Sequence, residues 1–189
     1  MSQAAAKNTQ SSKFSVRDIC YTGLFAAVIA VMAQISIPMP LGVPMTMQTF
    51  AITLAAVVLG SKLSAMASLV YLILGAVGVP VLASFSGGID KFVGPTGGFL
   101  ISFPLMAYII GLGVEHRNAF KGAFPLAVVV GTVLNYIVGV ILFVIVAHST
   151  VAVAISACVL PFIPTAIIKA VLACAIGLNI RKRIPGLKA

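Results

Sequence analysis

The stretch ISACVLPFIPTAIIKAVLACAIGL, residues 155–178, is long and apolar enough to cross a lipid bilayer, which takes about 20 residues. It carries one charge, Lys169, and no comparable apolar stretch contains an Asp or Glu to pair with it. A lone charge at bilayer depth costs about 2.5–3.5 kcal/mol on insertion scales. We therefore predict that Lys169 binds a small carboxylate in an apolar cavity. The alternative is a lysine that snorkels to the interface or bonds carbonyls freed by the nearby prolines.

Composition extends this prediction to the whole chain. Its 189 residues are 61% hydrophobic and 8% charged, which is typical of an integral membrane protein. The length accommodates about six spans of roughly 20 residues and no second domain. We predict an all-α integral membrane protein, a single bundle of six transmembrane helices over residues 17–183. Residues 1–16 are expected to be a disordered cytoplasmic tail and residues 184–189 a short cytoplasmic tail.

Proline and glycine mark the boundaries of the expected spans. These spans are Ile19–Ile37, Thr46–Leu59, Leu63–Val77, Gly97–Val114, Phe124–Ala147 and Val151–Ile180, the last interrupted by Pro161 and Pro164. Two Pro/Gly-rich connections, Pro38–Thr46 and Val79–Pro95, are expected to close over a ligand.

The basic residues set the orientation. With six spans, one side of the membrane receives Lys7, Lys13, Arg17, Lys62, Arg117, Lys121, Arg181, Lys182, Arg183 and Lys188. The positive-inside rule then places both termini in the cytoplasm and leaves only Lys91 in an outer connection. The net charge of +9 is thereby assigned to membrane topology and not to nucleic acid.

The sequence contains no catalytic constellation. No GK[ST] phosphate loop occurs, so ATP cannot be used through a Walker site. His116 and His148 fall in connections on opposite faces, and the three cysteines form no CxxC pair. We predict neither an enzyme nor a metal or cofactor site.

Two side-chain amides within the spans are candidate ligand contacts. Asn135 shares a helix face with Gly131 and Gly139 at four-residue spacing. Gln48 stands at the outer mouth of a short span. Either amide can bind a polar ligand group, or can simply link helices or cap one.

A second motif, Gly94-Pro95-Thr96-Gly97-Gly98-Phe99, opens the fourth span. Gly97 and Gly98 allow close approach of a ligand, and Phe92 and Phe99 are candidate walls of an apolar pocket. The alternative is an ordinary turn before a helix. On the first span, the small-residue pair Ala26 and Ala30 suits docking of another helix, from this chain or from a partner.

Taken together, four segments resemble the BioY family of biotin-binding S components of energy-coupling-factor (ECF) vitamin transporters. They are residues 34–38 (QISIP), 47–51 (MQTFA), 94–99 (GPTGGF) and 160–164 (LPFIP) followed by Lys169. The resemblance extends from about Arg17 to Arg183. It implies a six-helix protein of the prokaryotic cell membrane that captures biotin on the outer side.

The resemblance also implies partners: a transmembrane coupling subunit, which would dock on Ala26 and Ala30, and two cytoplasmic ATPases. Lys169 is expected to bind the carboxylate of biotin, and Asn135 and Gln48 its ureido group. Many BioY sequences carry Asp where this chain has Ala166, so Asn135 or Gln48 is expected to substitute for that carboxylate. Two other functions stay open: an S component for another small carboxylate vitamin, and an accessory membrane subunit without a ligand.

Overall fold

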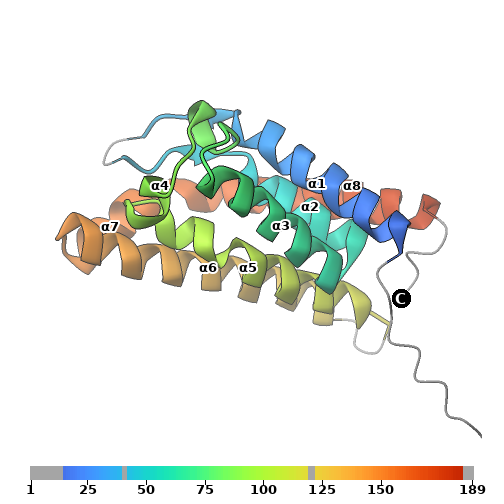
Figure 1. The fold of residues 1–189 in the computed structure, drawn as a ribbon. Coiled ribbons are helices and arrows are strands. Elements are labelled where there is room, and N and C mark those ends of the chain that lie inside the picture. The colour runs from blue at the N-terminus through green and yellow to red at the C-terminus, as the bar shows by residue number, and fades with distance from the viewer. Residues whose placement is uncertain (1–14, 40–41, 119–121, 185–189) are drawn as a thin grey trace, which may run out of the picture.

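Each long apolar stretch of the sequence forms a helix in the computed structural model, which describes residues 15–39, 42–118 and 122–184 (Figure 1). The long helices are α1 (Val16–Ala33), α2 (Gln48–Leu59), α3 (Ser61–Ala76), α5 (Gly97–Glu115), α6 (Ala123–Ala147), α7 (Val151–Cys158) and α8 (Ile163–Arg183). Shorter elements are β1 (Ser36–Ile37), β2 (Met45–Thr46), the 3-10 helices η2 (Ala83–Phe85) and η3 (Leu160–Phe162), and α4 (Asp90–Val93).

The predicted helical membrane architecture is confirmed in its main outline. Within the described residues, α1, α5, α6 and the continuous stretch Val151–Arg183 are long and apolar enough to cross a membrane, and α2 and α3 are shorter apolar helices. The predicted interruption at Pro161 and Pro164 is also confirmed, since η3 separates α7 from α8. Most of the two predicted tails, residues 1–14 and 185–189, lies outside the described residues.

The two Pro/Gly-rich connections and the residues beside them contain more regular structure than the sequence indicated. The first predicted span was too long at its end, since α1 stops at Ala33 and Ser36–Ile37 form β1. Strands β1 and β2 pair antiparallel, with Ser36 opposite Thr46 and Ile37 opposite Met45. The second connection folds into η2 and α4. Such short elements have too few residues for a hydrophobic period to reveal them.

Helix α2 is the centre of the bundle. Its 12 residues extend only about 18 Å, less than the ~30 Å hydrocarbon core. Every residue from Phe50 to Leu59 is buried, and the helix packs against α1, α3, α5 and α8. A helix covered on all sides needs no polar face, which explains why Thr53 is the only polar residue from Phe50 to Leu59.

Polar contacts hold the helix ends together at one end of the bundle, where the described chain begins and ends (Figure 1). The buried Arg181 donates from Nη1 to Val57 O and Val58 O, both at 3.1 Å, and so satisfies carbonyls in the last turn of α2. Glu115 accepts from Ser61 N at 2.7 Å and from the Ser61 hydroxyl at 3.0 Å. Between α2 and α3, Gly60 adopts a φ of 84°, which permits a turn of a single residue.

The two alanines of the predicted docking surface differ in exposure. Ala26 is only 4% exposed and belongs to the core cluster, whereas Ala30 is partly buried against that cluster. Small residues on the outward side of α1 are Gly23 and Ala27. Ala26 thus serves helix packing within the chain and is absent from the outer surface of the bundle.

Replacing Glu115 with Ala tests the contact at the start of α3. We expect a lower midpoint of thermal unfolding in detergent, because loss of a helix cap costs about 0.5–2 kcal/mol. Asp90→Asn is the matched control, since the Asp90 side chain is 69% exposed and, among the described residues, its carboxylate forms an ion pair only with Lys91. An unchanged midpoint for Glu115→Ala would refute the capping role.

Candidate ligand-binding cavity

A cavity of about 420 Å³ lies among segments far from Arg181 and the other basic helix ends. Its walls come from the β1–β2 hairpin, the N-terminal turns of α2, α5 and α8, the middle of α6, the short elements α4 and η3, and residues 82–86. The lining residues are Gly42, Val43, Pro44, Thr46, Gln48, Thr49, Leu82, Ala83, Ser84, Ser86, Lys91, Thr96, Phe99, Leu100, Phe103, Asn135, Tyr136, Phe162, Thr165, Ala166 and Lys169. Both connections that were expected to close over a ligand therefore contribute.

Lys169 lines this cavity from α8. Its Nζ donates to the backbone carbonyl of Thr46 in β2 at 2.7 Å. No carboxylate among the described residues pairs with it. Because an ammonium group has three N–H donors, the contact with Thr46 leaves others for a ligand.

Gln48 also lines the cavity, but both ends of its amide are engaged within the chain. Its Oε1 accepts from the Thr46 hydroxyl at 2.7 Å, and its Nε2 donates to the hydroxyl of the fully buried Tyr71 at 2.6 Å. The residue thereby fixes Thr46, whose carbonyl receives the Lys169 ammonium. Its structural role is to orient that contact.

Asn135 is 2% exposed and presents an acceptor at the cavity. Its Nδ2 donates to Phe99 O at 3.0 Å and to the Ser102 hydroxyl at 2.8 Å. These bonds use both amide hydrogens, and the Asn135 Oδ1 accepts no hydrogen bond from the residues that the structure describes. The oxygen is suited to a ligand N–H donor.

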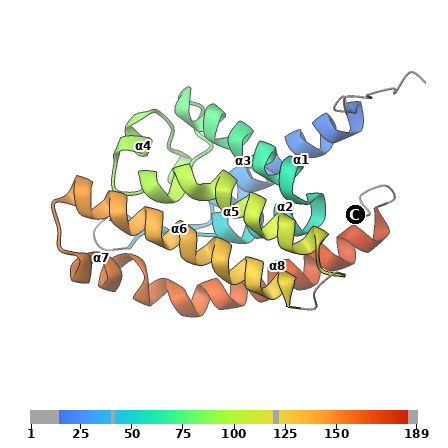
Figure 2. The same cartoon turned by 90° about the horizontal axis from the view of Figure 1, so that it is seen from below.

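The remaining predicted residues stand at different depths. Phe99 lines the cavity and meets the Tyr136 ring edge-to-face, with ring centroids 6.4 Å apart. Gly98 does not line it: a Cβ at this position would collide with Val138 O and Gly139 Cα, so Gly98 lets α5 approach α6. The two helices lie side by side along much of their length (Figure 2).

Phe92 and Gly97 likewise lie behind the wall. Gly97 is in contact with Phe92 O, and Phe92 is partly buried against the core cluster. Neither residue lines the cavity. Their position supports the backbone that presents Thr96 and Phe99.

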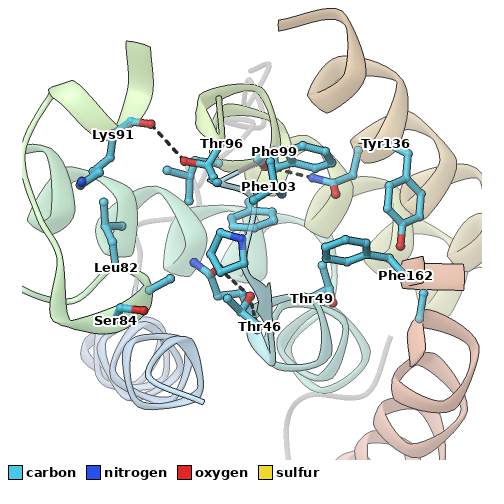
Figure 3. Close-up of a pocket in the computed structure, with 18 of the residues that line it drawn as sticks. Thr46, Thr49, Leu82, Ser84, Lys91, Thr96, Phe99, Phe103, Tyr136 and Phe162 are labelled. Atoms are coloured by element: carbon cyan, nitrogen blue, oxygen red, sulfur yellow. Dashed lines mark hydrogen bonds between the residues drawn. The ribbon is translucent and has the colours of Figure 1, made fainter. Parts of the chain in front are cut away.

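Several lining residues were missed by sequence reasoning. Tyr136 and Phe162 stand at one side of the cavity, whereas Lys91, Leu82 and Ser84 stand at the other (Figure 3). The sequence could have indicated two of them as cavity residues. Phe162 lies inside the segment LPFIP, and Lys91 was the only lysine expected in an outer connection. For Ser84 the sequence offered no such indication, because its place depends on the fold of the second connection.

Comparison with known proteins identifies the family of this chain. The model of the BioY family matches residues 6–186. The chain belongs to the BioY family. A biotin transporter BioY of Thermotoga maritima is 42% identical over 168 residues, which covers 88% of this chain and 97% of that protein. A biotin transporter BioY of Rhizobium etli is 34% identical over 186 residues, which covers 93% and 98% of the two chains.

A solved structure extends the similarity to three dimensions. The crystal structure of the S-component for biotin from an ECF-type ABC transporter has a TM-score of 0.80 and 26% sequence identity. It covers 95% of this chain and 96% of that chain. Ala166 lines the cavity in this BioY chain.

Thr49→Cys tests whether water reaches the cavity. We expect a small hydrophilic thiosulfonate to modify this cysteine readily, because only a thiol that water reaches forms the reactive thiolate. Ser68→Cys is the matched control, since Ser68 is fully buried in α3. Both variants are built after replacing Cys20, Cys158 and Cys174, and modification is read by intact mass. Equal protection of the two positions would contradict an accessible cavity.

Proposed function

We propose that this chain captures biotin in the cavity and acts as the substrate-binding subunit of an ECF-type uptake transporter. The observation that carries the proposal is a largely apolar cavity with an incompletely bonded ammonium at Lys169 and an available acceptor at Asn135 Oδ1. Its volume of about 420 Å³ falls within the usual range for small-molecule sites. Relatives named biotin transporters supply the identity of the ligand.

The groups of biotin suit this lining. Its carboxylate would accept from Lys169, and a ureido N–H would donate to Asn135 Oδ1. The apolar ring and chain would lie against Phe99, Phe103 and Phe162, which surround the cavity. Gln48, Phe92, Gly97 and Gly98 would act on the ligand indirectly, by fixing the backbone around it.

A second ammonium, Lys91, stands across the cavity. It pairs with Asp90 at 3.5 Å and its side chain is 43% exposed. A charge that is exposed and already paired gains less from a ligand carboxylate than the half-buried Lys169, whose partner is a neutral carbonyl. We therefore assign the carboxylate to Lys169.

The same proposal includes six spans with both termini in the cytoplasm. The buried α2 and the partly exposed α3, both short, would complete the bundle alongside the four longer spans. The basic ends of α1 and α8 would face the cytoplasm, and the cavity would open outward. A transmembrane coupling subunit and two cytoplasmic ATPases would then drive delivery, with Ala30 and the outward side of α1 as the docking surface.

Reporter fusions test this orientation. We expect alkaline phosphatase fused after the C-terminus to be inactive and green fluorescent protein at the same place to fluoresce. A fusion in the connection after His148, at the other end of α6, should behave in the opposite way. Active phosphatase at the C-terminus would contradict the proposed topology.

Comparing biotin with biotin amide tests the role of Lys169. Wild-type protein should bind the acid more tightly than the amide, and Lys169→Met should remove most of that difference. Loss of one member of a charged pair at a buried site costs about 2–5 kcal/mol, which is about 30-fold to 4,000-fold in Kd. Isothermal titration of each purified variant with both ligands gives the comparison.

Lys91→Met is the matched control and should keep the preference for the acid. A preference lost only in Lys91→Met would move the carboxylate to Lys91 without affecting biotin capture. A panel of other carboxylate vitamins tests the choice of ligand. Tighter binding of one of them, or no binding of biotin by the ligand-free wild-type protein, would refute biotin capture.

A further inference from the structure

The cavity wall formed by residues 82–86 has an unusual backbone. Leu82, Ala83, Ser84 and Ser86 all line the cavity. Ser84 and Phe85 adopt φ values of 57° and 54°, in the left-handed region that residues other than glycine rarely occupy. Two such residues in succession persist only where surrounding contacts hold them.

Gln34, the residue that ends α1, supplies those contacts. Its Nε2 lies 3.1 Å from Val81 O and 3.2 Å from Leu82 O, and it also bonds Ala30 O within its own helix. Its Oε1 accepts from Phe85 N at 2.7 Å. One amide thus clamps both ends of the turn that contains the left-handed residues.

Other contacts of the wall are of two kinds. Leu82 is 2% exposed and packs against Gly75, which anchors the start of the wall in the core. At the other end, Phe85 is 72% exposed, and among the described residues the Ser84 hydroxyl bonds only that of Ser36, at 2.9 Å. Within the turn, Leu82 N donates to Ser86 O at 2.9 Å and the Ser86 hydroxyl donates to Ala83 O at 2.7 Å. The exposed half of the wall is consequently held by hydrogen bonds more than by packing, and Gln34 supplies the bonds that tie this turn to α1.

We propose that Gln34 is a positioning residue that keeps this wall closed over the bound ligand and so sets how fast the ligand leaves. Gln34 does not line the cavity, so it acts on the ligand only through the wall. The inference rests on the proposed capture of biotin. It also gives a role to Gln34 in the segment QISIP, which the ligand contacts leave unexplained.

Gln34→Met tests the inference, because it keeps the length of the side chain and removes its hydrogen bonds. We expect the rate of biotin release, measured by chase of labelled biotin, to rise about tenfold or more. The amides of residues 82–86 should exchange hydrogen faster in the ligand-free protein. Gln34→Glu, which retains the acceptor for Phe85 N, should fall between Gln34→Met and wild type. Thr22→Val is the matched control, since this buried hydroxyl bonds Asp18 O within α1.

A second variant guards against misfolding of Gln34→Met. Phe85→Gly leaves Gln34 and the cavity lining intact and removes the steric cost of the left-handed backbone. It should release biotin more slowly than wild type. Release and amide exchange unchanged in a folded Gln34→Met protein, or faster release from Phe85→Gly, would overturn the inference.

Failure of the proposed function gives a different result. If wild-type protein binds no biotin, capture is refuted together with the effect on its release. Amide exchange of residues 82–86 then still decides whether Gln34 holds the wall. Equal exchange in Gln34→Met and wild type would refute that as well.

Discussion

The hydrogen bond from Lys169 Nζ to Thr46 O is the contact on which the cavity depends. It connects α8 to the β1–β2 hairpin, two segments separated by 123 positions in the chain, across the space that the ligand would fill. A carbonyl satisfies one donor of an ammonium without neutralising its charge. The charge is thus held in place and remains attractive to an anion. Thr46 is in turn oriented by Gln48, and Gln48 by Tyr71 in the core. Through these hydrogen bonds, the rigid core of the bundle fixes the position of the Lys169 ammonium at the cavity.

The shortness of α2 creates room for this arrangement. A central helix of full membrane length would occupy the space between α5, α6 and α8. Instead α2 begins at Gln48, and the hairpin and residues 82–86 cover the volume beyond its first turn. At the opposite end, Arg181 and Glu115 satisfy the backbone groups at the junction of α2 and α3, which hydrocarbon could not. One end of the bundle is consequently fastened by buried polar contacts, and the other carries a cavity closed by short segments.

The sequence was informative where one physical term dominates. Hydrophobic length located the main helices, and the two prolines located the break before α8, because each removes a backbone donor. An unpaired charge and a lone amide within spans pointed to Lys169 and Asn135, both of which line the cavity. Contacts between distant segments were out of reach. The Gln48 side chain donates a hydrogen bond to Tyr71, and the local sequence of neither residue predicts that contact. For the same reason the sequence left open whether Ala26 packs within the chain or against a partner, because small residues favour close packing equally well in both cases.

The two sides of the cavity are held by unequal forces, and this bears on how a ligand enters. On one side, Asn135, Phe99 and Phe103 belong to long packed helices, and their displacement would disturb the contact of α5 with α6. On the other, residues 82–86 carry two left-handed residues, and the Gln34 amide ties their exposed end to α1. Opening this wall would break a few hydrogen bonds and relieve backbone strain. Opening the helical side would expose apolar side chains of many residues and would therefore cost more free energy. A ligand that must enter without unfolding the bundle would therefore pass beside the wall, while the helices keep the groups that recognise it in place.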